Sequence, residues 1–522
     1  MKQENGKEKE RMKEQEGIIY IDTEQLENIP AGLNLYGARK MMMERQQSCL
    51  NHSFVSIVIL AYNRLDKTKQ CVESVLKHTK EIDYELILVD NGSSDGTLDY
   101  FKKVPYKKKS IICITKPMGT NFAFCWLSCV DVGRYVVFLA NDLICTPNWL
   151  KNLLTCMESD ERIGMVNPVS SNVSNFQEVS LSFSSIEEME EKAELYNQSD
   201  SRKWEERLRL ITLGSLFRTE ALMSIGFPIF DAGFLHDFGD DDLSFRLRRN
   251  GYRLILATDT WIHHNHDFRN FEDKKKEQFI YSLNLGREQF QKKYFEVDSW
   301  EDTIVEGEEI IRECPVIEGK QSFFALGIDV KCGSPLLELK NHLRSHGMFD
   351  VQLDAFVQES KYREDLCSIC NGTVVCDREE GLRLSFPKQS YDYVILGKPL
   401  NSYNEPWVML EDSMERVREG GYLIVSLENA FSYLEFFHIL GRREIYRRDF
   451  VYPIPYEECQ KQIEQYGTLV SSKMHFFTLP KDEENIVRNV WEKTNGIQSD
   501  PMNFCHLMTK KYLFIVQKQD KR

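Results

Sequence analysis

Between Val55 and Asp142 this chain alternates apolar runs of strand length with helical stretches, and that alternation restricts the folds open to it. The helical stretch KTKQCVESVLKHT places Cys71, Val72 and Val75 on one face. Apolar strands separated by helices predict a parallel sheet with helices on both faces, so the first half is expected to be an α/β domain. The strand-length runs are Ser56–Tyr62, Glu85–Asp90, Ile111–Thr115 and Arg134–Asp142.

Polar residues stand where three of these runs end. The ends read Ala61–Arg64, Asp90–Gly96 and Ala140–Asp142. In an open parallel sheet, ligands bind outside the carboxyl ends of the strands. We therefore expect these three ends to line one crevice.

Five segments of the chain resemble the family 2 glycosyltransferases, in the order in which that family has them. They are Val55–Arg64, Val89–Thr97, Leu139–Asp142, Asp240–Arg246 and His263. The resemblance implies a GT-A fold over residues 54–270. It also implies an enzyme that moves a sugar from a nucleotide diphosphate to an acceptor. The departing diphosphate concentrates negative charge, which a divalent cation can neutralise.

The resemblance places the metal on Asp142 and His263, with Mg²⁺ or Mn²⁺ as the expected ion. Hard cations prefer oxygen ligands, and Mn²⁺ also accepts imidazole. Ala140 stands where the family often has the first aspartate of its Asp-x-Asp motif, so we expect a weakened metal site.

Several histidines surround the predicted ligand in WIHHNHD, which begins at Trp261. If this stretch is extended, His263 and Asn265 point one way, and His264 and His266 point the other. We therefore expect His264 to face away from the crevice. Zinc is not expected, because the stretch offers neither a cysteine partner nor a helical pair of histidines.

The same resemblance predicts the donor-binding residues. Asp90 would hydrogen-bond the base or ribose, although Asp-Asn-Gly is also good turn chemistry and a simple turn cap stays open. Asn141 would contact the ribose or a phosphate, and Arg64 the base or the diphosphate. The full predicted donor set is Ala61, Tyr62, Asn63, Arg64, Asp90, Asn141 and Asp142.

Inverting transfer needs one general base to take the proton of the acceptor hydroxyl. Aligned to the family, Asp240 is that base and Asp242 the second aspartate, while Gly239 stands where glutamate is usual. Clustered carboxylates can raise one pKa toward a useful value. The alternative is an acidic helix N-terminus favoured by the macrodipole. Arg246 on the same helix could pair with these acids.

Residues 320–522 resemble class I methyltransferases that use S-adenosylmethionine, which implies a second, Rossmann-like α/β domain. Their cofactor loop would be Asp329–Pro335, in which only Gly333 fits the usual glycine spacing. Lys331 and Pro335 hold the other two positions, where side-chain bulk and a fixed φ oppose close approach of a cofactor. Lys398 and Asn401 replace acidic positions common in relatives. We expect a degenerate domain for which S-adenosylmethionine is an unlikely cofactor.

Four segments follow from these patterns. Residues 1–53 form an N-terminal tail and lead-in, residues 54–270 the glycosyltransferase domain, residues 271–319 a helical connector, and residues 320–522 the methyltransferase-like domain. Within the first segment, we expect a disordered tail over 16 residues, then a short extended stretch and a helix. The charged stretch 180–210 predicts a solvated helical insertion, with a lid or acceptor-recognition element as the alternative.

Composition excludes several partners. The net charge of −15 disfavours a phosphate backbone, so we expect no nucleic acid. No apolar run approaches the roughly 20 residues that a membrane span needs, and the charged N-terminus does not resemble a secretory signal. We expect a cytoplasmic protein.

The chain is thus predicted to be an inverting, metal-assisted hexosyl- or rhamnosyltransferase. Its donor would be a UDP- or dTDP-sugar, and its acceptor a saccharide or a protein, because similar bacterial enzymes build surface glycans or modify proteins. One alternative is a bifunctional glycosyltransferase and methyltransferase. The other is a non-catalytic protein that binds sugar nucleotides.

Overall fold

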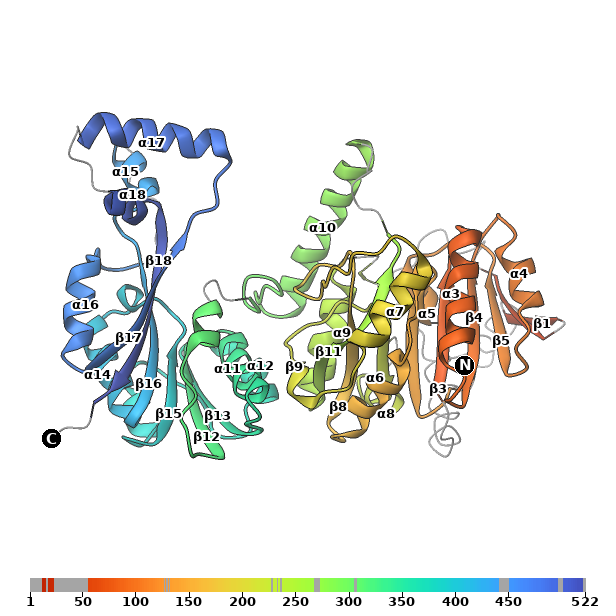
Figure 1. The fold of residues 1–522 in the computed structure, drawn as a ribbon, viewed down its shortest axis with the longest axis horizontal. Helices are drawn as coiled ribbons and strands as arrows, with labels where there is room; N and C mark the ends of the chain where they lie inside the picture. The colour runs from red at the N-terminus through yellow and green to blue at the C-terminus, as the bar shows by residue number, and fades with distance from the viewer. Residues whose placement is uncertain are drawn as a thin grey trace. The chain divides into compact units, whose positions relative to one another are not determined.

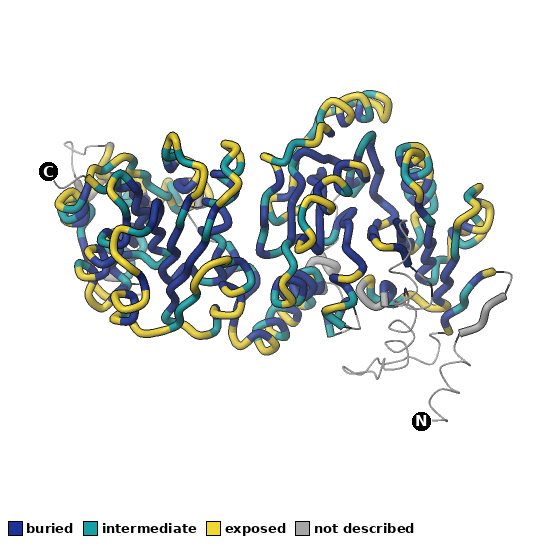
Figure 2. Tube along the Cα trace, turned by 90° about the horizontal axis from the view of Figure 1, so that it is seen from below, coloured by how far each residue is buried: buried dark blue, intermediate teal, exposed yellow. Residues whose placement is uncertain are grey.

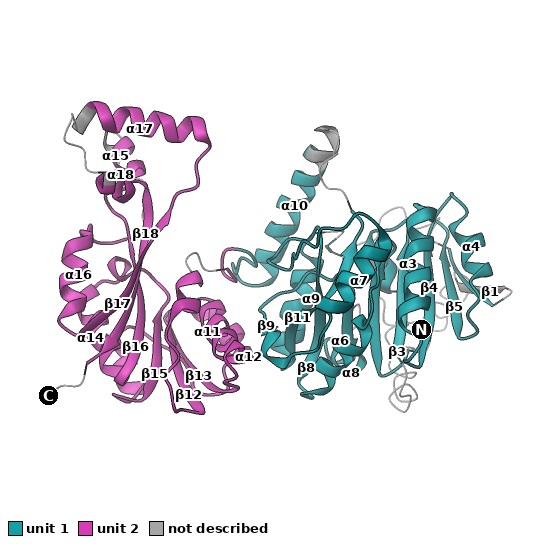
Figure 3. Cartoon of the chain, in the orientation of Figure 1, with its two compact units in different colours: residues 1–300 teal, residues 301–522 magenta. Residues whose placement is uncertain are grey.

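The computed structural model describes residues 12–15, 17–22, 55–125, 127, 130, 132–226, 229–231, 233–234, 237–266, 273–304, 308–440, 450–495 and 501–519. Contacts divide the chain into two compact units, Met1–Trp300 and Glu301–Arg522 (Figure 3). The helix that we expected shortly before residue 50 lies outside the described residues.

The first unit contains one eleven-stranded mixed sheet (Figure 1). Its order is β1-β2-β5-β4-β3-β6-β10-β8-β11-β7, with β9 paired to β11. The predicted parallel arrangement holds from β2 to β6, whereas β10 is antiparallel to both of its neighbours. The strands are β1 Met12–Gln15, β2 Ile18–Ile21, β3 Val55–Ala61, β4 Tyr84–Asn91, β5 Lys109–Ile114, β6 Tyr135–Ala140, β7 Leu143–Ile144, β8 Ile163–Ser170, β9 Trp204–Glu206, β10 Ser215–Arg218 and β11 Arg253–His264.

Both faces of this sheet are covered, which explains why β3 is apolar without interruption. Ile57 and Ile59 pack with α3, α4 and α6 on one face, while Val58 and Leu60 pack with α5, α7, α8 and α9 on the other. Figure 2 shows the strands as buried tube between half-exposed helices. The helices are α3 Leu65–His78, α4 Thr97–Lys103, α5 Thr120–Cys125, α6 Trp149–Glu158, α7 Ile186–Tyr196, α8 Thr219–Ser224, α9 Gly239–Arg249 and α10 Asp273–Lys293, with the short η2 Ser201–Lys203.

The N-terminal segment corrects one expectation. Met12–Gln15, which we placed in a disordered tail, forms β1 and pairs antiparallel with β2. In turn, β2 pairs in parallel with β5, with Ile18 opposite Ile111. The polar sequence MKEQ has no apolar pattern, so the sequence did not predict this strand. An edge strand is held by backbone hydrogen bonds and needs no apolar face.

The charged stretches 180–210 and 271–319 contact the rest of the units to which they belong. In the predicted insertion, Glu190 of α7 pairs with Lys77 and His78 of α3. In the predicted connector, Phe290 of α10 is fully buried against Phe238 and other rings of the first unit. The segment η4 Glu308–Glu313 belongs to the second unit.

The second unit has a seven-stranded sheet of order β14-β13-β12-β15-β16-β18-β17. The first five strands are parallel, and β18 runs antiparallel between β16 and β17. The strands are β12 Ser322–Ile328, β13 Asp350–Val357, β14 Val374–Cys376, β15 Tyr391–Leu396, β16 Val417–Glu428, β17 Gly467–Phe476 and β18 Thr509–Lys518. This is the Rossmann-like domain that we expected for residues 320–522, and the structure adds antiparallel pairing of β18 with β16 and β17.

Helices flank this second sheet and gather at one end of it. They are α11 Ser334–Ser345, α12 Arg363–Ile369, α13 Gly381–Ser385, α14 Pro406–Arg416, α15 Tyr433–Leu440, α16 Tyr456–Glu464, α17 Lys481–Asn495 and α18 Pro501–Met508, with the short η5 Ser360–Tyr362 and η6 Leu400–Ser402. Three of them, α15, α17 and α18, lie together beyond the end of β16 (Figure 1).

Candidate functional site

The turns after β3 and β4 are tied together at the carboxyl edge of the first sheet. Ala61 lies opposite Asp90 in the parallel register. Beyond that pair, the backbone N–H of Asn63 donates to Ser93 Oγ at 2.9 Å, and the backbone N–H of Ser94 donates to Asn63 Oδ1 at 2.9 Å. The ends of β3 and β4, two of the three strand ends that we expected to line one crevice, are therefore joined by hydrogen bonds.

The turn after β3 adopts an unusual backbone that Asn141 supports. Asn63 and Arg64 both lie in the left-handed region, with φ of 53° and 59°. The amide nitrogen of Asn141 donates to the carbonyl of Asn63 at 2.8 Å and to Thr68 Oγ1 at 2.9 Å. Both amide hydrogens of Asn141 are thus used to position this turn. Contact of its side chain with the ribose or a phosphate stays a prediction, since Oδ1 can still accept a hydrogen bond.

Asp90 is buried, with 2% exposure, and accepts the backbone N–H of Ser93 at 3.0 Å. Burial raises the pKa of Asp90, and the hydrogen bonds from Ser93 oppose that rise. The turn cap that we kept as an alternative is thus present. Contact with a nucleotide base or ribose stays a prediction, and the two roles are compatible because a carboxylate can accept several hydrogen bonds.

The turn after β4 also approaches the segment after β5. Gly92 has φ of 74°, and a Cβ at this position would lie 2.6 Å from the backbone nitrogen of Pro117. Asn91 holds the same segment, since its amide donates to the carbonyl of Met118 at 2.6 Å. A glycine is therefore needed here for both conformation and space.

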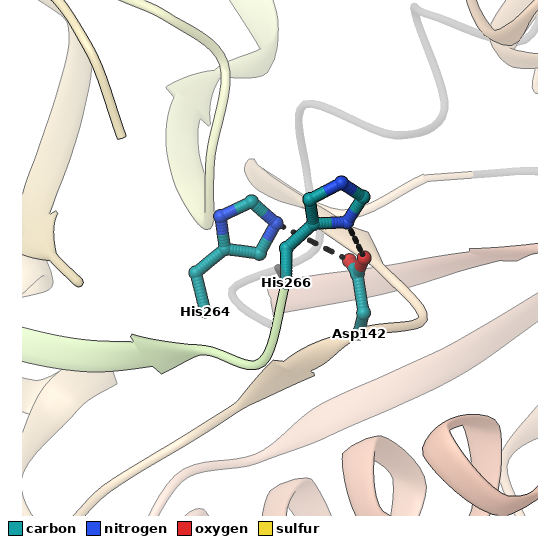
Figure 4. A group of neighbouring side chains, drawn as sticks. All are labelled: Asp142, His264 and His266. Carbon is teal, nitrogen blue, oxygen red and sulfur yellow. Dashed lines mark hydrogen bonds and ion pairs between the residues drawn. The ribbon is translucent and has the colours of Figure 1, made fainter. Parts of the chain in front are cut away.

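Asp142 is the centre of a charged cluster just beyond β6. Its side chain is 8% exposed. One carboxylate oxygen lies 3.2 Å from Arg64 Nη1 and 3.1 Å from His266 Nδ1, and the other lies 3.6 Å from His264 Nε2 (Figure 4). Burial alone raises the pKa of Asp142, but the hydrogen bonds and charges of the two histidines outweigh burial and hold the pKa at about 2. The carboxylate is therefore ionised at any physiological pH.

The neighbouring histidines are not the one that we predicted. His263 points to the opposite side, where its Nδ1 lies 2.8 Å from Ser171 Oγ and its ring meets Phe183 edge-on. Burial, followed by the nearby positive charges, lowers the pKa of His263 to about 4. We expected His264 to face away from the crevice, and this expectation was wrong.

The physical reason is the register of β11. The alternation that we inferred is correct, because His264 and His266 do share one side of the extended chain. Pairing with β7 sets which side that is, with His264 opposite Leu143. The backbone N–H of Asn265 then donates to the carbonyl of Asp142 at 2.9 Å, which carries the chain past the carboxylate. The His-x-His spacing at the end of a strand was the available signal.

The orientation of His264 prepares it to bind a cation. Its Nδ1 lies 2.9 Å from the carbonyl of Asn172, so this nitrogen must donate its hydrogen. In the neutral ring, Nε2 is then left as a lone pair that faces the carboxylate of Asp142. A proton or a metal cation between His264 Nε2 and the carboxylate of Asp142 makes the close approach of these two groups favourable. Fixing the tautomer through the other ring nitrogen is how proteins orient histidine ligands.

Asp142, His264 and His266 fit a divalent cation. Among the described residues, their ligand atoms all lie within 4.8 Å of one another. One carboxylate and two imidazoles leave further positions open for other ligands. This mixed set suits Mn²⁺ better than Mg²⁺, which prefers oxygen throughout. It also resembles a zinc site more closely than we expected from the sequence.

His264→Ala and His266→Ala are each expected to weaken Mn²⁺ binding at least tenfold, because each removes one of the three ligands. His263→Ala is the matched control from the same strand, and we expect it to leave the affinity unchanged. Isothermal titration of the full chain with MnCl₂ measures all three. A tenfold loss in His263→Ala with no loss in the other two would restore the ligand set implied by the sequence.

The aspartates at the start of α9 have different surroundings. Asp241 pairs with Arg209 at 2.9 Å. Asp242 is fully buried and pairs with Arg246 at 2.8 Å, the partner that we anticipated, and accepts the hydroxyl of Tyr294 at 2.7 Å. Both are therefore held in structural ion pairs.

Asp240 differs from these two neighbours. Burial raises its pKa to about 6, and the negative charge of Asp241 adds to the rise. A carboxylate with such a pKa binds a proton more readily at neutral pH than an ordinary aspartate. Asp240 thus has a property that a general base needs.

The cofactor loop of the second unit does not fit S-adenosylmethionine. Lys331, at the first glycine position, has φ of 49°, and its ammonium lies 3.1 Å from Asp302. Lys398 lies 3.9 Å from Asp329 and 3.4 Å from Glu359, which follow β12 and β13. The cofactor is a sulfonium cation, so an ammonium between these two acids opposes it. The loop also touches Gly397, where a Cβ would lie 2.5 Å from the carbonyl of Asp329.

Asn401 has a structural role in the same unit. It is fully buried, and its amide donates to the carbonyls of Glu428 and Tyr452 at 3.0 and 3.2 Å. Its oxygen accepts the backbone N–H of Glu428 at 3.1 Å. The position that is acidic in the family thus fastens β16 to η6 here, and it is not available to a cofactor.

Comparison with known proteins finds a family match in the first half of the chain. Residues 56–226 match the model of glycosyl transferase family 2. A curated relative, the UDP-Glc:alpha-D-GlcNAc-diphosphoundecaprenol beta-1,3-glucosyltransferase of Escherichia coli, is 34% identical over 110 residues, which are 20% of this chain and 42% of that protein. The first curated relatives are thus matched over less than half of their own length.

Solved structures resemble parts of the chain weakly. A mannosyltransferase from Pyrobaculum calidifontis in complex with GDP-Man and Mn²⁺ is 18% identical, with a TM-score of 0.30, and the likeness covers 45% of this chain and 67% of that one. A SAM dependent methyltransferase from Archaeoglobus fulgidus is 16% identical, with a TM-score of 0.28, covering 44% of this chain and 98% of that one. Within the described residues, no helix is both long enough and apolar enough to cross a membrane.

Proposed function

We propose that this protein transfers a sugar from a nucleotide diphosphate donor to an acceptor, since residues 56–226 match the model of glycosyl transferase family 2. The observation that carries the proposal is the cluster of Asp142, His264 and His266 at the carboxyl edge of the sheet, beside the turn that holds Arg64. Ligands of open α/β sheets bind at this edge.

A divalent cation held by these three side chains would neutralise the negative charge that develops on the departing diphosphate. Arg64 is suited to assist, since its guanidinium is half exposed and lies at the same carboxylate. The mixed nitrogen and oxygen ligands favour Mn²⁺. Ala140 is exposed at the end of β6, so the missing first aspartate leaves room there and does not disturb the fold.

Asp240 would act as the general base of an inverting transfer. Its raised pKa lets it accept the proton of the acceptor hydroxyl during attack on the anomeric carbon. The ion pairs of Asp241 and Asp242 fix the start of α9 and so hold Asp240 in place.

The donor and the acceptor follow from the family alone. The Escherichia coli relative is named for UDP-glucose and for a saccharide acceptor linked to diphosphoundecaprenol. We therefore propose a UDP- or dTDP-hexose as the donor and a saccharide as the acceptor, with a protein acceptor as the second choice.

Release of the free nucleoside diphosphate tests the proposed function. We expect the full chain to hydrolyse at least one of UDP-glucose, UDP-N-acetylglucosamine, dTDP-rhamnose and GDP-mannose slowly in MnCl₂. Addition of EDTA should lower that rate to background, and MgCl₂ should restore it less well than MnCl₂. Binding of every donor without turnover at any metal concentration would favour a non-catalytic sugar-nucleotide-binding protein instead.

A further inference from the structure

The second unit contains a cavity of 550 Å³ that no part of the proposed reaction uses. It lies where α15, α17 and α18 gather beyond β16, and α16 and β18 complete its walls. Its volume falls within the range of about 300–1,000 Å³ that is usual for small-molecule sites. Open α/β sheets bind ligands at this edge, and Asn429, the first residue after β16, lines the cavity.

Aromatic rings form much of the lining, and they are held in place by one another. Tyr456 packs on Tyr512 with ring centroids 4.7 Å apart, and His506 Nδ1 lies 2.8 Å from the hydroxyl of Tyr512. Trp491 is 9% exposed and packs on Phe504 at 5.3 Å. Tyr456, Trp491, His506 and Tyr512 all line the cavity, although they come from four different elements.

The rim of the cavity differs from its wall. Phe431 and Phe436 are 56% and 37% exposed, although both are large apolar residues that normally seek burial. Glu457 and Asn503, also at the lining, are exposed and polar. The cavity thus presents flat apolar faces beside hydrogen-bonding groups.

These features select one class of ligand. Among the described residues that line the cavity, the charged group is the carboxylate of Glu457, and Asn429, Asn503 and His506 add amide and imidazole groups. A neutral sugar has apolar C–H faces that can pack on aromatic rings, and hydroxyls that can bond to carboxylate, amide and imidazole groups.

We propose that this cavity binds a neutral saccharide, and that it thereby holds the acceptor glycan on the same chain as the transferase domain. The link to the acceptor rests on the proposed function, whereas saccharide binding does not. Holding a glycan at a second site raises its effective concentration at the first, without any need for contact between the two units. The cofactor loop has lost its fit, but the neighbouring cavity keeps a binding role.

Titration of the full chain with neutral oligosaccharides of glucose, mannose and N-acetylglucosamine, without nucleotide or metal, tests the proposal. We expect at least one to bind, and Phe431→Ala and Glu457→Gln each to raise its Kd at least tenfold. Both positions are exposed, so both variants should fold. Phe349→Ala and Glu464→Gln are the matched controls, an exposed phenylalanine elsewhere and an exposed glutamate on the same helix α16.

The outcomes separate this inference from the proposed function. An unchanged Kd in Asp142→Ala, with a loss in Phe431→Ala and Glu457→Gln, supports the cavity even if no donor is ever turned over. Absence of saccharide binding, or a Kd that none of the cavity variants changes, overturns it. Tight binding of the apolar dye 1-anilinonaphthalene-8-sulfonate that saccharides do not displace also overturns it, in favour of an apolar ligand.

Discussion

Asp142→Ala is expected to lower kcat for Mn²⁺-stimulated sugar transfer by about 10³-fold or more, since metal stabilisation of a developing charge supplies several kcal/mol. The carboxylate is ionised, largely buried, and the single anionic group of the cluster that includes His264 and His266. Its removal leaves the two histidines and Arg64 facing each other without a counter-charge. Initial rates at saturating donor, measured across a range of Mn²⁺ concentrations, give the size of the effect.

Asp66→Ala is the matched control, because Asp66 is an exposed aspartate in the first turn of α3, close in sequence to Arg64. It should keep both the rate and its dependence on Mn²⁺. Thermal unfolding of both variants shows whether Asp142→Ala remains folded. If Asp142→Ala is folded and still responds to Mn²⁺ with a normal rate, Asp142 does not bind the metal. The main observation behind the proposed function would then be wrong.

Asp240→Asn is expected to lower kcat by about 10²–10⁴-fold while the KM for the donor stays nearly unchanged, because the amide cannot take the acceptor proton. The same group sets the pH dependence of the native protein. Burial raises the pKa of Asp240 to about 6, and the base works only when deprotonated. The rate should therefore fall about tenfold per pH unit below 6 and level off above it.

Asp241→Asn separates this effect from general damage to α9. Asp241 is buried in an ion pair with Arg209, so its loss should lower the melting temperature. The acidic limb of the pH profile should remain but move to lower pH, because the negative charge of Asp241 contributes to the raised pKa of Asp240. A profile measured on folded protein at each pH is the readout. If Asp240→Asn keeps the acidic limb of the profile near pH 6, the base lies elsewhere in the chain.

Strand patterns predicted the parallel half of the first sheet and the placing of Asp142 at its edge. An uninterrupted apolar run such as Ser56–Tyr62 has one low-energy solution, burial on both faces, and the carboxyl ends of parallel strands meet by geometry alone. The resemblance to methyltransferases marked Lys331 and Pro335 as unsuited to a cofactor loop, and the loss of S-adenosylmethionine binding stays a prediction. β1 was missed because an edge strand leaves no apolar pattern.

Sequence patterns could not decide whether His263 or His264 lies beside Asp142. Alternation separates the two residues but does not say which of them faces the crevice, since a shift of one residue in register exchanges the faces. Pairing of β11 with β7 settles the question in favour of His264. Asn141 is a similar case, because its side chain supports the left-handed turn at Asn63 and Arg64, which no sequence pattern predicted.

By itself, the sequence determined the α/β class of each unit, the order of the motifs and the identity of the central carboxylate, because these depend on hydrophobic periodicity and on which residues follow a strand. The tertiary structure alone decided which histidines join Asp142 and how α15, α16, α17 and α18 enclose a cavity. Those outcomes depend on contacts between segments far apart in the chain, and local periodicity holds no information about such contacts.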